Sequence, residues 1–457
     1  MTIRFFIGLF VLFLMLSCNT SVKNESIYFG GLIKNPKSKK VEILKNNKII
    51  STAKLDYNHN FMFKLDSLNS GLYTFKHGEE VQYIYLEPKD SLLIRLNTWD
   101  FDGSLVFSGN GANRNNYLIQ LFLDNEKEER LFYDYYKLDE ENFNLKIDSI
   151  LNLKKIQYKQ FKQNSTKQNP DFENLIYAIT NFPLYAKKEK YPLHYKEIHH
   201  LNKLPKLSVN FYRHRADNFN LYKDHYTFKD YLWNKIYNKS YYQLEKDTLN
   251  ELSSILLEQI TKLVKTEDEK NNMLNQTYIN SLFDNSCANA NKEKTKQLYF
   301  KYCTDSIKKN RVLKIIKTIN TLKKGDRLPK FYLKNTEKKL ISSIKASTNN
   351  TVIYFWPKEK NRIKNMAKRI NFLIKKYPNI NFIGIDGQLN ADNWKAFIQN
   401  NKLDIAKQFQ LVAQNKNTFY TNDFPRAVII KDGIIQNNFT IVSQYNFEQL
   451  LVSIYKN

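Results

Sequence analysis

Short apolar runs separated by turn residues fill residues 27–115. Asn46-Asn47 and Ser70-Gly71 stand between such runs, and Asn, Ser and Gly are residues that tight turns favour. Many short strands at this spacing are typical of a small sandwich or barrel. We therefore predict an N-terminal β-domain over 27–115. Its predicted strands are 41–44, 61–65, 72–75, 83–86, 92–96 and 105–107.

Residues 116–320 change to a helical pattern. Apolar side chains recur there at steps of three and four, as in Leu118, Leu121 and Phe122, which places them on one face of a helix. Tyr and Phe are frequent, and we interpret them as the core of a helical bundle rather than as a ligand groove. Proline disfavours helix interiors. We therefore predict that four prolines divide the region into several helices: Pro170, Pro183, Pro192 and Pro205.

Residues 321–457 alternate between strand and helix patterns. The apolar run 351–356 predicts a buried strand, and residues 360–376 carry an apolar stripe typical of a core-facing helix. A second strand pattern and a second amphipathic helix pattern follow. Asp432 and Gly433 fit the tight turn of a hairpin. The chain is therefore predicted to be a multidomain α+β protein: a β-sandwich or barrel, a helical middle region and a C-terminal α/β domain.

The chain is strongly basic. Its 457 residues include 71 Lys and Arg against 45 Asp and Glu, which gives a net charge of +26. Most of the basic residues are Lys and are spread along the whole chain, whereas nucleic-acid-binding domains gather Lys and Arg on one stripe. We therefore expect no nucleic-acid partner. The charge favours a weak attraction to anionic surfaces such as membrane headgroups.

The first residues have the pattern of an export signal. Arg4 precedes an apolar run at 5–16, which is too short to span a bilayer, and the run ends in Leu16-Ser17-Cys18.

This pattern resembles the lipobox of bacterial lipoproteins, in which the peptidase cleaves before the cysteine and the thiol receives a lipid. The resemblance implies a signal peptide over 1–17, lipidation of Cys18 and a polar tether over 18–26. The alternative is an ordinary signal peptide with an incidental cysteine. The tether lacks the acidic cluster of many surface-exported lipoproteins of Bacteroidota. We therefore expect a cell-envelope protein, anchored in the outer membrane by its lipid and facing the periplasm.

Two further cysteines, Cys287 and Cys303, lie in sequence with a helical pattern. The envelope is a compartment that permits disulfides. A disulfide that staples two helices and a pair of buried, unpaired thiols are both consistent with the sequence.

Histidines cluster in the middle of the chain, but their spacing fits no metal-ligand pattern such as HExxH. We interpret them as solvated or partly buried side chains, and we predict no metal site and no cofactor. The clustered residues are His194, His199, His200, His214 and His225.

Three segments of the C-terminal region resemble the thioredoxin-like fold. Residues 325–333, GDRLPKFYL, are similar to the lead-in of peroxiredoxins (the AhpC/TSA group) and TlpA-like proteins. Residues 351–365, TVIYFWPKEKNRIKN, resemble the active-site corner, and 424–435, FPRAVIIKDGII, resemble the proline-hairpin block. The likeness is to membrane-anchored thiol–disulfide oxidoreductases of the TlpA/ResA type. The phrases at 85–96 and 107–118 resemble the β-domain that precedes a thioredoxin domain in many Bacteroidota lipoproteins.

The two cysteines of that family are missing here. In the family, the first cysteine of Trp-Cys-x-x-Cys is nucleophilic because a helix N-terminus stabilises its thiolate. Alignment from Trp356 without gaps puts Lys360 and Ile363 at the two positions. Neither side chain can perform thiol–disulfide exchange. We interpret Lys360 as a solvated charge rather than a nucleophilic amine, and we predict no catalytic residue.

The resemblance also implies a peptide-docking edge. In the thioredoxin-like fold the proline that opens the hairpin block is cis and faces the active-site turn, and the backbone before it offers a donor and an acceptor to an extended chain. We therefore predict a cis Phe424–Pro425 bond and a binding groove of Trp356, Pro357, Lys360, Phe424 and Pro425. The alternative is that the proline only shapes the turn.

Three functions remain open at this point. The leading hypothesis is a redox-inactive module that binds a protein or peptide partner. The second is a TlpA-like thiol–disulfide oxidoreductase that uses atypically placed cysteines. The third is a structural or assembly component of the outer membrane.

Overall fold

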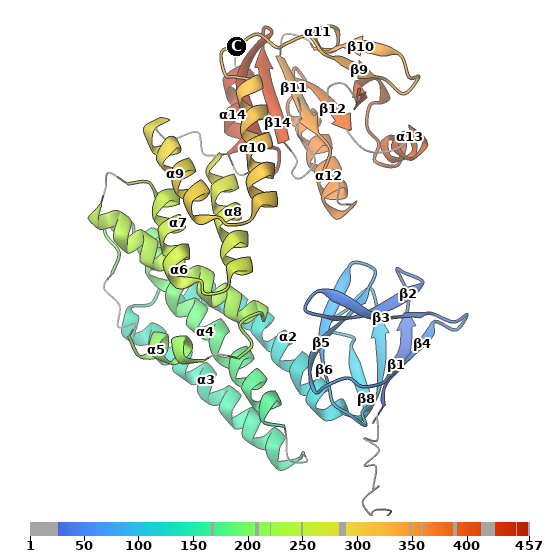
Figure 1. The fold of residues 1–457 in the computed structure, drawn as a ribbon, viewed down its shortest axis with the longest axis vertical. Coiled ribbons are helices and arrows are strands. Elements are labelled where there is room, and N and C mark those ends of the chain that lie inside the picture. The colour runs from blue at the N-terminus through green and yellow to red at the C-terminus, as the bar shows by residue number, and fades with distance from the viewer. Residues whose placement is uncertain are drawn as a thin grey trace, which may run out of the picture. The chain divides into compact units, whose positions relative to one another are not determined.

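Figure 1 shows the fold in a computed structural model of the protein. The structure describes residues 26–457 except 166–168, 206–209, 220, 248–249, 283–288, 348–349, 358–359, 387–390, 413–425, 445 and 456–457. The chain divides into two compact units, Met1–Asn238 and Lys239–Asn457. The boundary falls inside the region predicted to be helical.

The first unit begins with two four-stranded sheets, which confirms the predicted N-terminal β-region. Their strand orders are β4-β1-β7-β8 and β3-β2-β5-β6. The sequence pattern did not predict β1 and β3. The strands are β1 (Ile27–Lys34), β2 (Lys40–Lys45), β3 (Lys48–Lys54), β4 (Asn60–Leu65), β5 (Gly71–His77), β6 (Glu80–Leu86), β7 (Ser91–Asn97) and β8 (Val106–Asn110).

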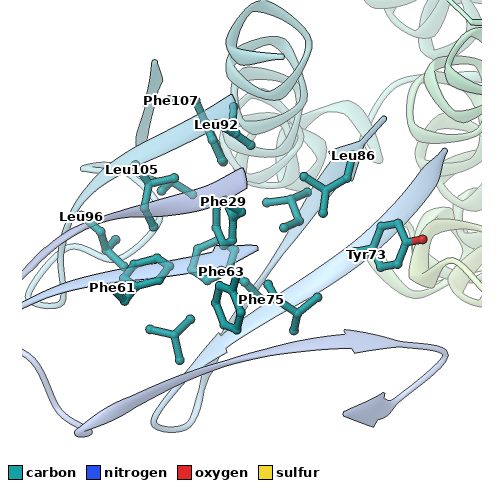
Figure 2. Close-up of a cluster of buried hydrophobic side chains, with 14 of the residues drawn as sticks. Phe29, Phe61, Phe63, Tyr73, Phe75, Leu86, Leu92, Leu96, Leu105 and Phe107 are labelled. Carbon is teal, nitrogen blue, oxygen red and sulfur yellow. The ribbon is translucent and has the colours of Figure 1, made fainter. Parts of the chain in front are cut away.

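One aromatic-rich core lies between the two sheets, as Figure 2 shows. Strands β4 and β7 alternate strictly between exposed and buried residues, as expected for strands with one buried face. The Phe29 ring of β1 packs on Phe61 of its own sheet at 5.5 Å and on Phe75 of the other sheet at 5.8 Å, between ring centroids. Such pairs add to the stabilisation that comes from burying apolar area, and they hold the sheets together as a sandwich.

Two consecutive asparagines tie the first helix, α2 (Ala112–Tyr135), to both sheets. The Asn115 side chain accepts from Tyr85 N at 2.8 Å and donates to Tyr85 O at 2.9 Å. The Asn116 side chain accepts from Phe107 N and donates to Phe107 O, both at 2.9 Å. The amides thus pair with strand backbone in the way a neighbouring strand would.

Helices complete the first unit. The prediction that Pro183 and Pro192 end helices is wrong, because both lie inside α4. Pro183 has no N–H to offer the Ile179 carbonyl, and the Asn125 side chain of α2 donates to that carbonyl at 3.4 Å. Pro170 stands in the first turn of α4, where a missing N–H is tolerated. The helices after α2 are α3 (Glu140–Gln163), α4 (Pro170–Ile198), α5 (Asn210–Asn218) and α6 (Tyr226–Lys246), which crosses the unit boundary.

The second unit combines further helices with a seven-stranded sheet of order β10-β9-β13-β12-β11-β14-β15. The helices before the sheet are α7 (Leu252–Leu263), α8 (Glu267–Leu282), α9 (Asn289–Tyr302) and α10 (Ser306–Thr321). The strands are β9 (Tyr332–Lys334), β10 (Leu340–Ser342), β11 (Asn350–Phe355), β12 (Asn381–Asp386), β13 (Gln408–Leu411), β14 (Arg426–Lys431) and β15 (Ile434–Ile441). The helical elements among them are α11 (Ser343–Ala346), α12 (Lys360–Lys376), α13 (Ala391–Asn400), the 3-10 turn Ile405–Lys407 and α14 (Phe447–Tyr455).

The strand directions give this sheet a thioredoxin-like topology. β11 and β12 are parallel and are joined through α12. β14 pairs antiparallel with β11 and forms an antiparallel hairpin with β15, and α14 follows the hairpin. A βαβ unit joined to a ββα unit within one sheet is the thioredoxin-like arrangement, so the predicted C-terminal thioredoxin-like α/β domain is confirmed. In the part of the chain that the structure describes, no helix has the length and apolar character needed to cross a membrane.

Candidate binding site at the start of helix α12

The corner between β11 and α12 holds part of the predicted groove. Trp356 and Pro357 follow β11 directly and are buried. Lys360 is the first residue of α12. Phe424 and Pro425 lie outside the described residues, so their predicted contact with Trp356 and the predicted cis bond stay predictions.

Trp356 is a core side chain in this structure. It is 4% exposed, and its indole Nε1 donates to Gln408 Oε1 at 3.1 Å. Its ring meets the rings of Tyr354 and Phe397 edge to face, with centroids 5.2 and 5.0 Å apart. Trp356 therefore supports the corner as part of the core. A ligand bound at the surface would contact more exposed residues.

A buried polar cluster supports the corner. Gln408 is 1% exposed and donates from Nε2 to the Tyr354 hydroxyl at 2.9 Å. Burial raises the pKa of Tyr354 above its ordinary value, so the hydroxyl stays protonated at neutral pH. A Cβ at Gly384 would lie 2.0 Å from Gln408 Oε1, so glycine is required there for the cluster to fit.

Residues 304–457, which include the corner, contain no cysteine. Ile363 packs half-buried against the core that α12 covers. Cys303 is buried and has no disulfide partner among the described residues, and its Sγ lies 3.8 Å from the Asp305 carbonyl oxygen. Cys287 lies outside the described residues, so a disulfide with Cys303 and two unpaired thiols both stay predictions.

A groove that the sequence reasoning missed runs between α12 and the end of β15. Its volume is about 380 Å³, within the lower range of ligand sites. The groove begins in the first turn of α12, at Arg362. One signal in the sequence could have pointed to it, the run 360–376 in which every charged residue is basic. The lining residues are Arg362, Asn365, Met366, Arg369, Ile441, Val442 and Ser443.

One carboxylate faces the basic side chains beside the groove. Glu448 of α14 accepts from Arg369 at 2.8 Å, from Lys376 at 2.5 Å and from the Tyr377 hydroxyl at 3.1 Å. The Lys376 hydrogen bond, followed by those of Arg369 and Tyr377, holds the pKa of Glu448 below its usual value. Glu448 is therefore ionised at neutral pH, and it balances one of the two cations that it meets.

Arg426, the first residue of β14, is fully buried without a carboxylate partner among the described residues. It donates from Nε and Nη2 to the Asn438 carbonyl at 3.2 and 2.8 Å, and its guanidinium lies between the Phe355 and Phe439 rings. Burial lowers the pKa of Arg426 to about 9. No local pattern predicts this burial, because Arg426 lies in a segment whose residues indicate only a hairpin strand.

The histidine cluster is dispersed over several elements. His225 is buried, and its Nδ1 forms a hydrogen bond of 2.8 Å with Thr227 Oγ1. His199 and His214 are exposed. Over the described residues, no group of three or more His, Cys, Asp or Glu side chains could hold a metal ion.

No protein-family model and no curated protein matches the chain. Solved structures resemble part of it. A thiol:disulfide interchange protein from a Bacteroides species is 12% identical over 30% of this chain and 93% of that one, with a TM-score of 0.26. The thioredoxin domain of a thiol-disulfide oxidoreductase from Bacteroides vulgatus is 12% identical over 29% of this chain and 99% of that one, also with a TM-score of 0.26. A thiol-disulfide oxidoreductase from Bacteroides fragilis is 20% identical over 28% and 98%, with a TM-score of 0.24. The assignment of the fold rests on the order and direction of the strands.

Proposed function

We propose that this chain is an envelope lipoprotein whose thioredoxin-like domain binds a protein or peptide partner and performs no dithiol exchange. The observation that carries the proposal is the β11–α12 corner, which has the thioredoxin-like topology but no cysteine in or after it. Exchange requires a thiolate nucleophile and a resolving thiol, and neither Lys360 nor Ile363 supplies one.

Binding through the corner needs an edge for an extended chain. The predicted cis Phe424–Pro425 bond would leave backbone donor and acceptor groups next to the start of α12, where a peptide can add as a strand. The α12 groove runs along the first turns of that helix and supplies an apolar floor and positive charge. Both features suit capture of a segment rather than chemistry on it.

The proposed cellular location follows from the N-terminal sequence pattern. Cys18, after the apolar run 5–16, would carry the lipid and place the protein in the outer membrane, facing the periplasm. Mass spectrometry of the mature protein should find an acylated Cys18 at the N-terminus. A mature N-terminus at another residue would contradict lipidation while leaving the binding proposal intact.

The function is tested by two measurements on the same protein. Catalytic reduction of insulin should be absent in the wild type and in a Cys287→Ser/Cys303→Ser variant, which would lose only about 2–4 kcal/mol of stability if the two were paired. Insulin reduction by the wild type that the double variant lacks would establish the oxidoreductase alternative instead.

The second measurement is partner capture from solubilised envelopes. Phe424→Asp should abolish capture at an unchanged melting temperature. Leu340→Asp, at an exposed apolar position of β10, is the matched control, because it makes the same change from an apolar to a negatively charged side chain. Capture that both variants retain would leave the proline with a purely structural role.

A further inference from the structure

We infer that the α12 groove, lined by the seven residues given above, binds an acidic peptide segment with an apolar side chain beside its carboxylate. The inference rests on the proposed partner-binding function and names the chemistry of the segment bound. Arg362 and Arg369 would take the carboxylates, and the apolar side chain would enter the groove between them.

The spacing of the lining residues places them on one face of α12. Residues 362, 365, 366 and 369 are three and four apart, so they are neighbours on the helix surface. Met366 and Val442 are 5% and 1% exposed, and they form an apolar floor. Arg362 is exposed and the Arg369 side chain is 28% exposed, so guanidinium groups stand at the rim. Guanidinium groups bind carboxylates through parallel hydrogen bonds, and the apolar floor can contact an aliphatic side chain next to the carboxylate.

The charge around the groove is positive. All charged residues of α12 are basic, and the positive end of the helix dipole lies at its first turn, where Arg362 stands. Glu448 offsets only part of this charge, since it meets both Arg369 and Lys376. An anionic occupant is therefore favoured over a cationic or neutral one.

Shape favours a peptide over a membrane. The groove's apolar floor is recessed, and a volume of about 380 Å³ accommodates only one or two side chains. Insertion into a bilayer needs apolar side chains that protrude. Phe372, which is 48% exposed between Arg369 and Lys376, extends the same face by one turn and offers a contact to the continuing peptide.

The test measures fluorescence anisotropy of a fluorescein-labelled peptide, Gly-Glu-Leu-Asp-Leu-Glu-Gly, with the purified full-length chain. Arg362→Gln/Arg369→Gln should weaken binding at least about tenfold, the loss expected for removing charged hydrogen bonds. Lys364→Gln/Lys368→Gln removes the same charge from the other, exposed face of α12 and should change affinity less than about twofold. Raising the salt concentration should weaken wild-type binding.

A second variant guards against loss of folding in the arginine double variant, since Arg369 also pairs with Glu448. Ser443 is exposed at the rim of the groove, and Ser443→Glu should repel the peptide while the melting temperature stays unchanged. Equal weakening by both double variants, full binding to Ser443→Glu, or equal binding of a peptide with Lys in place of its acidic residues would overturn the inference.

Two outcomes separate this inference from the proposed function. Wild-type binding to phosphatidylglycerol vesicles that depends on Arg362 and Arg369, without peptide binding, would assign the groove to lipid headgroups and refute the peptide. Insulin reduction by the wild type would refute the proposed function, and the anisotropy measurement would still decide whether the groove holds an acidic segment.

Discussion

The indole Nε1 of Trp356 donates a hydrogen bond of 3.1 Å to Gln408 Oε1, across 52 residues of sequence. The bond joins the residue after β11 to the first residue of β13 inside the domain. The same Gln408 side chain donates to the Tyr354 hydroxyl. One buried amide therefore hydrogen-bonds both the Trp356 indole and the Tyr354 hydroxyl. These hydrogen bonds hold the corner between β11 and α12 from the core side.

Replacing Gln408 by Leu should destabilise the second unit. The substitution leaves the Trp356 indole N–H and the Tyr354 hydroxyl buried without this partner, which we expect to lower the free energy of unfolding by about 1–3 kcal/mol. Urea denaturation followed by tryptophan fluorescence measures the change. Gln399→Leu on the exposed face of α13 is the control and should have little effect. Equal stability of both variants would show that the buried hydrogen bonds contribute nothing net.

Replacing Arg426 by Met should stabilise the same unit. Among the described residues no carboxylate meets this buried guanidinium, and its two hydrogen bonds go to one carbonyl. Apolar replacements of buried charges are often neutral or stabilising. Met can fill the space between Phe355 and Phe439 and contact both rings. We expect the free energy of unfolding to rise by about 1–2 kcal/mol, measured by chemical denaturation. A loss of more than that amount would mean that Arg426 organises the strand it begins.

His225 should make the first unit sensitive to acid. Burial between the rings of Tyr83 and Tyr226 lowers the pKa of His225 from 6.5 to about 4. Between these values the unfolded chain binds a proton that the folded chain does not. The contribution of His225 to the free energy of unfolding is therefore fully present above pH 6.5. It is lost as the pH falls toward 4, which lowers the free energy of unfolding by up to about 3 kcal/mol.

The measurement is the pH dependence of urea unfolding for His225→Gln. Its free energy of unfolding should change less between pH 6.5 and 4 than that of the wild type. His214→Gln, at an exposed position of α5, should keep the wild-type slope. Parallel curves for all three proteins would contradict the assignment to His225.

The sequence was most informative where a pattern is local. The stripe of α12 and the turn at Asp432 follow from spacing alone, and both are present. The predicted helix end at Pro183 is wrong because the Asn125 side chain donates to the Ile179 carbonyl that Pro183 leaves without a helical partner. Asn125 lies 54 residues away from that carbonyl in the sequence. Local propensity contains no information about such partners.

The candidate site was predicted less well for the same reason. The sequence predicts Trp356 in a surface groove, but the structure buries it. Its burial depends on Gln408 of β13 and Phe397 of α13, which lie later in the sequence. The α12 groove exists only because the end of β15 lies beside Arg362 and Arg369. Neither relationship can be read from the order of residues within one segment.

The paired contacts of Asn115 and Asn116 have a consequence for association. They occupy the backbone N–H and C=O of Tyr85 in β6 and of Phe107 in β8, each the last strand of its sheet. Open strand edges are templates on which other chains add. A fragment that stops at 110, or a cut between the two asparagines, would uncover these edges and invite strand exchange between molecules. The helix that follows the sandwich thereby covers part of these two edges, and we expect the sandwich and the helix to fold together.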